Sequence, residues 1–154
     1  MIQRVQTIFL FLAFIAGLLS FFFPIAHFSI DENWIVLGLF GIENYSTMTV
    51  SINTIPLIAI MGLISLIAFV TIFLFKNRIA QIRILRFGVL LNVVYLVLLF
   101  FFYVPDIEEA TGTTAEYITQ PGIYFPIAIL AFFLLASRFI MKDEKLIRSA
   151  DRIR

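Results

Sequence analysis

Few residues in this sequence are suited to chemistry. His27 is the only histidine, and the carboxylates of Asp31 and Glu32 lie four and five residues after it. Imidazole and carboxylate groups bind divalent metals, but one histidine beside two carboxylates makes at most a weak site. There is no cysteine, so disulfides, thiolate ligands and cysteine nucleophiles are excluded. We therefore expect no catalytic residue, no metal and no cofactor, and we predict that the chain is not an enzyme.

Two polar residues stand out because long apolar stretches surround them. Asn92 lies five residues inside the stretch that begins at Phe87, and Thr71 lies four residues before Phe75 at the end of the preceding stretch. At about 1.5 Å per helical residue both lie roughly 6 to 8 Å deep. We predict that Asn92 hydrogen-bonds Thr71, or a backbone carbonyl one turn away, as a helix-packing contact. The alternative is that Asn92 lines a polar path for a solute.

Four apolar stretches must position these residues. The chain is 62% hydrophobic and 14% charged, which is too apolar for a soluble domain of this size. A membrane-spanning helix needs about 20 apolar residues, and four stretches approach or reach that length. The predicted spans cover residues 5–23, 55–75, 87–104 and 123–141.

Prolines mark the ends of these stretches. Pro24 and Pro105 follow the first and third, whereas Pro56 and the Pro121–Pro126 segment lie at the starts of the second and fourth. Proline is tolerated in the first turn of a helix and prevents one from continuing, so we expect the helix boundaries at these positions. The first stretch is expected to be retained, because no small residues suited to signal-peptide cleavage precede Pro24.

The basic residues are confined to one set of connecting segments. The eleven Lys and Arg residues lie at Arg4, within 76–86 and from Arg138 onward, and none lies between Phe23 and Pro56 or between Val104 and Ser137. Basic residues flanking spans mark the cytoplasmic side. The sequence thus predicts one domain, residues 1–154, that is an all-α four-transmembrane-helix bundle with both termini in the cytoplasm. It carries no basic footprint for nucleic acid.

The first outer segment is expected to form a β-hairpin over about residues 34–53. Trp34–Gly41 is rich in β-forming residues, Thr47–Asn53 alternates polar and apolar residues, and Glu43–Ser46 is the expected turn. In the second strand Val50 and Ile52 would be shielded, and Thr49 and Ser51 would face water. An isolated two-stranded hairpin is only marginally stable in water, so this one must pack against another part of the chain, a partner or the lipid surface.

What covers this hairpin stays open. The remainder of the outer segments is one interpretation, and a partner protein or the lipid surface at Trp34 and Phe40 is the other.

The C-terminal tail, residues 142–154, is predicted to continue the fourth helix as a basic amphipathic helix. Its charges either enforce topology, bind anionic lipid or dock a cytoplasmic partner. The basic side chains concerned are Lys142, Lys145, Arg148 and Arg152.

Both ends of the chain resemble a known family. Met1–Thr7, Phe22–Pro24 and the closing 142–154 segment resemble an uncharacterised four-helix inner-membrane protein family of Bacteroidetes-type bacteria. The resemblance implies a multi-pass protein of the bacterial inner membrane with no assigned function. It brings no catalytic residues.

Two functions fit these observations. The predicted spans hold no Asp, Glu, Lys, Arg or His away from their ends, which argues against active transport. The favoured hypothesis is an accessory or assembly subunit of a larger envelope or protein-export complex, with the lipid bilayer around it. Its partner would bind through the outer hairpin, the first helix or the C-terminal tail. The alternative is a passive lipid- or small-solute-handling bundle.

Overall fold

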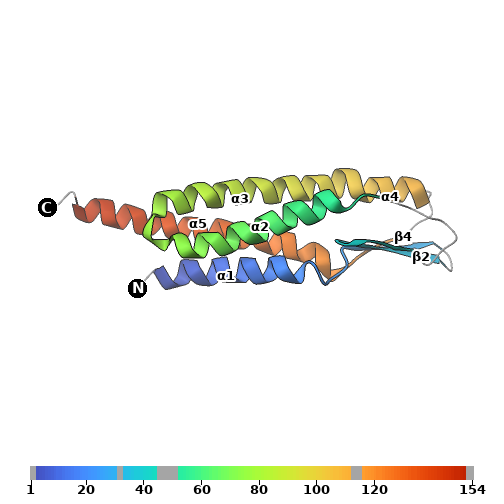
Figure 1. Cartoon of the computed structure of the whole chain (residues 1–154), viewed down its shortest axis with the longest axis horizontal. Coiled ribbons are helices and arrows are strands. Elements are labelled where there is room, and N and C mark those ends of the chain that lie inside the picture. The colour runs from blue at the N-terminus through green and yellow to red at the C-terminus, as the bar shows by residue number, and fades with distance from the viewer. Residues whose placement is uncertain (1–2, 31–32, 45–51, 112–115, 152–154) are drawn as a thin grey trace.

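Four long helices lie side by side, with a small sheet at one end (Figure 1). In this computed structural model the described residues are 3–30, 33–44, 52–111 and 116–151. Each long helix packs against two others, in the pairs α1–α2, α2–α3, α3–α5 and α5–α1. The four helices are α1 (Gln3–Leu19), α2 (Ile55–Phe73), α3 (Arg78–Leu98) and α5 (Tyr124–Asp151).

Aromatic pairs fix the direction of α1 against its neighbours. Phe9 stacks on Phe139 with ring centroids 5.5 Å apart, and Phe23, just beyond α1, lies 5.4 Å from Phe125 near the start of α5. Helices α1 and α5 therefore run antiparallel. Phe14 of α1 lies 5.2 Å from Phe69 of α2.

Three helical segments are long and apolar enough to cross a membrane, as judged over the described residues. They cover Ile55–Phe73, Arg78–Ala110 and Pro121–Leu146, and they contain most of the second, third and fourth predicted spans. The first predicted span contains a shorter apolar helix, Val5–Leu19. These apolar helices are compatible with an integral membrane protein, and many large apolar side chains on their outer faces are exposed.

Helix α1 ends earlier than the first apolar stretch. Beyond Leu19 the N–H groups of Phe21 and Phe22 bond three residues back, to Leu18 and Leu19, in a tightened turn. The residue before a proline is disfavoured in helical conformation, so Phe23 cannot continue the helix into Pro24. The predicted boundary at Phe23 was therefore too late.

Pro105 does not end the third helix, contrary to prediction. A π-helical turn, Leu99–Tyr103, follows α3, and α4 (Val104–Thr111) continues from it. The Val104 N–H bonds Leu99 O, five residues back, so the usual ladder is already interrupted where proline supplies no N–H.

The other proline assignments are confirmed. Pro56 occupies the first turn of α2, and Pro121 begins the 3₁₀ turn Pro121–Ile123 that leads into α5. The predicted helical continuation into the C-terminal tail is also confirmed, because α5 is unbroken to Asp151.

The connection between α2 and α3 is shorter than expected. A 3₁₀ turn, Leu74–Lys76, and the single residue Asn77 join them, and α3 begins at Arg78 rather than near Phe87. The Asn77 side chain accepts a hydrogen bond from the Ala80 N–H at 3.2 Å and so caps α3. The charged residues before Phe87 are helical. The predicted start at Phe87 was placed where the apolar stretch begins, and that criterion does not detect charged residues within a helix.

The sheet is antiparallel and joins two distant segments, in the order β3-β2-β1-β4. Its strands are β1 (Ala26–Ile30), β2 (Asn33–Gly38), β3 (Gly41–Asn44) and β4 (Glu116–Thr119). Strand β4 pairs with β1, with Phe28 opposite Tyr117, so the segment after α4 completes the sheet.

The predicted hairpin was wrong in its turn and its partner strand. Gly38 pairs with Gly41, so Leu39 and Phe40 form the turn, and Glu43 lies within β3 opposite Val36. Gly41 has φ of +149°, a backbone conformation that favours glycine. Residues 45–51, with Thr49, Val50 and Ser51, lie outside the described residues; the end of the expected second strand, Ile52–Asn53, is not in a strand.

Candidate functional site: a buried polar stripe and an aromatic groove

A stripe of buried residues runs along α3 and the π-helical turn. Its members recur every three or four residues, so they lie on one face of the helix, the face toward the interior. Four of the seven are polar or phenolic. The stripe comprises Gln81, Leu85, Gly88, Asn92, Tyr95, Leu99 and Tyr103.

The two ends of this stripe are anchored by hydrogen bonds. Gln81 Nε2 donates to the Thr71 carbonyl of α2 at 3.0 Å. Tyr103 Oη donates to the Asn53 carbonyl, just before α2, at 2.8 Å. These bonds fix α3 against both ends of α2.

The middle of the stripe is buried without partners. Asn92 and Tyr95 are both wholly buried, one helical turn apart. Among the described residues nothing hydrogen-bonds the Asn92 amide or the Tyr95 hydroxyl. Each such group costs about 1 to 3 kcal/mol when it stays unpaired.

The predicted bond between Asn92 and Thr71 was wrong. Thr71 Oγ1 instead donates to Ile67 O in its own helix at 2.6 Å, a local bond typical of threonine. The residue of α3 that hydrogen-bonds the Thr71 carbonyl is Gln81. Gln81 lies eleven residues before Asn92, so the two residues are about 16 Å apart along the helix. The depths were misjudged because α3 begins well before Phe87.

We expect Asn92→Leu to stabilise the protein by about 1 kcal/mol, because leucine has a similar shape and removes two unpaired buried polar atoms. Gln81→Leu is the comparison variant: it breaks the Nε2 bond to the Thr71 carbonyl while it removes the unpaired Oε1, so it should not show the stabilisation expected of Asn92→Leu. Unfolding in mixed detergent micelles, followed by circular dichroism, measures both. A destabilised Asn92→Leu variant would show that a molecule bound to the purified protein hydrogen-bonds the Asn92 amide.

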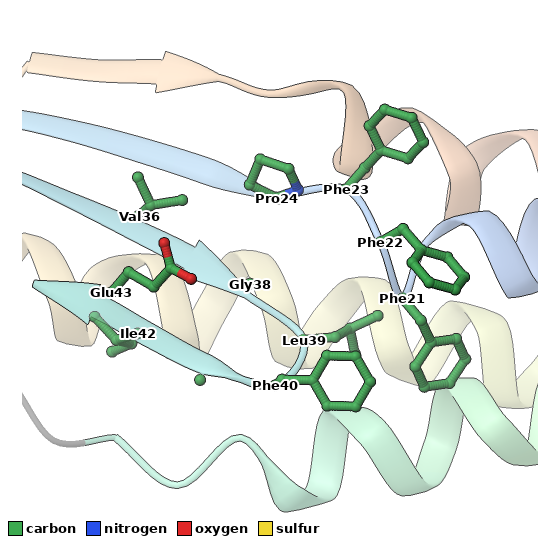
Figure 2. A pocket seen from close by; sticks show the side chains of 11 residues that line it. Phe21, Phe22, Phe23, Pro24, Val36, Gly38, Leu39, Phe40, Ile42 and Glu43 are labelled. Atoms are coloured by element: carbon green, nitrogen blue, oxygen red, sulfur yellow. The ribbon is translucent and has the colours of Figure 1, made fainter.

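A groove lies where the end of α1 meets the β2–β3 turn (Figure 2). It measures about 460 Å³, and its walls are mostly apolar. Phe40 at the turn lies 5.9 Å from Phe21, measured between ring centroids. The lining residues are Phe21, Phe22, Phe23, Pro24, Val36, Gly38, Leu39, Phe40, Gly41, Ile42 and Glu43.

One face of the sheet continues this groove. Phe28, Ile35 and Leu37 point to the buried face, and the alternate residues point to the other. Glu43, Val36 and His27 lie in one row across that second face, and the rings of His27 and Trp34 are 5.8 Å apart.

Trp34 and Phe40, which the sequence analysis assigned to one possible partner surface, lie on two different parts of the sheet region. Phe40 is strongly exposed at the groove, whereas Trp34 is half-buried on the adjoining sheet face. Lys142 and Lys145 are exposed near the far end of α5. Arg148 lies farther along α5, and Arg152 lies outside the described residues.

The histidine neighbourhood forms no metal site among the described residues, where no group of three His, Asp or Glu side chains comes together. His27 lies on β1, and Asp31 and Glu32 fall outside the described part of the chain.

Sequence reasoning missed Gln81, Tyr95, Tyr103 and the groove. The spacing of three and four residues that relates Gln81 to Asn92 and Tyr95 through Leu85 and Gly88 is visible in the sequence and would have indicated the stripe. The groove has no such signal, because it depends on how the Phe21–Pro24 segment meets a turn from another element.

Comparison with known proteins places the chain in a family. No curated protein matches it. One family model, described as a domain of unknown function, matches residues 2–153, nearly the whole chain. The chain belongs to the family described as domain of unknown function DUF4293.

Proposed function

We propose that this protein is a non-enzymatic accessory or assembly subunit of a larger complex in the bacterial inner membrane, either of the envelope or of protein export. In this proposal α1, α2, α3 and α5 each cross the membrane, both termini are cytoplasmic and the sheet is on the outer side. The partition of Lys and Arg supports that orientation.

The observation that carries the proposal is the placement of distinctive surfaces at opposite ends of the molecule. The sheet and groove lie at one end, and α5 projects past the other long helices at the opposite end (Figure 1). Lys142 and Lys145, in the C-terminal part of α5, are exposed. The helices between them offer no ionisable group at mid-depth for pumping or coupled transport.

The first test measures the membrane topology by cysteine labelling. Because the sequence contains no cysteine, each introduced cysteine is the only labelling site. Glu43 and Lys145 are both exposed, so single cysteines there should label without disturbing the core. In intact cells with a permeabilised outer membrane, an impermeant maleimide should modify Glu43→Cys and spare Lys145→Cys until the inner membrane is opened. Labelling of Lys145→Cys in intact cells would overturn the proposed orientation.

The subunit role is tested by photo-crosslinking in the native membrane. A photoreactive residue replaces Phe40, Trp34 or Lys145, and the lipid-facing position Leu90, which is 58% exposed, serves as control. The proposal expects one protein in stoichiometric yield from a surface position and none from Leu90. Crosslinks only to lipid at every position would reject the subunit role.

The second candidate is passive handling of a lipid or small solute. It is favoured by the unpaired Asn92 amide and Tyr95 hydroxyl, which a polar solute could satisfy. The Asn92→Leu experiment separates the two candidates, since a bound solute reverses its sign.

A further inference from the structure

The aromatic groove has the size and chemistry of a ligand site. Its volume of about 460 Å³ falls in the range of small-molecule pockets. Figure 2 shows the Phe21 and Phe40 rings next to each other, and the Glu43 side chain extending from β3 toward Val36 on β2; the planes of the two rings are tilted by 46°. An apolar wall with one carboxylate at its rim suits an amphiphile.

The groove lies at the boundary of the hydrocarbon layer, if α1 spans the membrane as proposed above. The fifteen residues of Val5–Leu19 rise about 22 Å, which is less than the roughly 30 Å to be crossed. The segment after Leu19 therefore lies within the leaflet at the sheet end of the molecule. Phe22 and Phe40 are 80% and 73% exposed, and in that placement they would face acyl chains instead of water.

Charge selects among the lipids of that leaflet. Among the residues that the structure describes, Glu43 is the only charged one that lines the groove. The sequence places no Lys or Arg between Phe23 and Pro56 or between Val104 and Ser137, so neither kind of side chain can pair with an anionic headgroup on this side. A carboxylate attracts an ammonium group and repels a net negative head.

We propose that the groove binds a phospholipid with an ammonium headgroup, of the phosphatidylethanolamine type. One acyl chain lies against Phe21, Phe22 and Phe40, and the ammonium group pairs with Glu43. This inference rests on the proposed membrane placement of α1 but not on the subunit role or on which side the termini lie.

The single tryptophan of the chain allows a direct test. In a Trp34→Phe background, Phe40→Trp puts the only tryptophan at the groove. The variant is reconstituted into vesicles in which one tenth of the lipid carries brominated acyl chains, which quench nearby tryptophan. We expect brominated phosphatidylethanolamine to bind about threefold more strongly than brominated phosphatidylglycerol, the scale of one exposed ion pair.

Two variants make the test specific. Glu43→Gln should remove the preference and leave total quenching unchanged. Phe101→Trp is the matched control, because Phe101 on the π-helical turn is also 73% exposed but does not line the groove. It should be quenched equally by both lipids.

The proposal fails if Phe40→Trp and Phe101→Trp show the same lipid ratio, or if Glu43→Gln keeps the preference. Quenching at Phe101→Trp but not at Phe40→Trp would place the groove against protein or water and also reject it. Native mass spectrometry of the unaltered chain with equimolar lipids gives a second readout, in which Glu43→Gln should again abolish the excess of the ethanolamine lipid. Neither readout depends on the crosslinking result.

Discussion

Gly122→Ala should destabilise the protein by about 3 kcal/mol, the upper part of the range for overpacking. A Cβ at Gly122 would lie 2.6 Å from the Phe23 carbonyl oxygen and 2.7 Å from the Pro24 carbonyl carbon. These are backbone atoms, so no side-chain rotation relieves the overlap. Detergent unfolding followed by circular dichroism measures the loss, and Trp34 fluorescence reports on the sheet.

The surrounding backbone is held from both sides. The Gly122 N–H bonds Pro24 O at 2.9 Å, and the Ile25 N–H bonds Leu37 O at 2.8 Å. A shift that accommodates a methyl group must therefore break the junction between α1, the sheet and the start of α5.

Gly62→Ala is the matched control. Gly62 lies within α2, and nothing lies within 4 Å of a Cβ built there. Alanine is favoured over glycine in a helix by up to about 1 kcal/mol, so this variant should be as stable as the parent or more so. If both glycine variants lose equal stability, the Phe23–Pro24 contact is not the cause.

How far the sequence predicts this fold depends on the range of the interactions. Pro56 and Pro121 act locally, and the helices begin where those residues indicate. The sheet does not follow from local pattern, because β1 finds its partner β4 some ninety residues later in the chain. Alternation along one segment identifies strand-forming residues but not which strand lies beside them.

The misassigned turn shows the same limit at short range. Glu43 and the residues after it have turn-forming composition, yet the turn lies at Leu39–Phe40. Glycines at both ends of Leu39–Phe40 permit the tight reversal, and Gly41 adopts a backbone conformation that other residues avoid. Gly38 and Gly41 were thus a stronger indication of the turn than the composition of the residues from Glu43 onward.

The buried site was predictable in kind but not in geometry. Asn92 is buried as its apolar surroundings predict. Its partner was chosen by matching depth from apolar boundaries, and that method fails when a helix extends through charged residues, as α3 does from Arg78. Register between helices depends on close contacts such as the one at Gly88, which composition does not show.

Gly88→Ala should destabilise the protein by about 2 kcal/mol, even though alanine favours helix, because three helices meet at this position. A Cβ there would lie 2.8 Å from Phe133 Cε2 of α5 and 2.9 Å from Ile67 Cγ2 of α2. Phe133 is wholly buried, so its ring has no free space to rotate into. In a Phe133→Leu background the shorter side chain withdraws, and the cost of Gly88→Ala should fall by about 1 kcal/mol, which a double-mutant cycle in detergent measures. An equal cost in both backgrounds would mean that Phe133 does not set the distance between α3 and α5, and that the register of the Asn92 and Tyr95 stripe is fixed elsewhere.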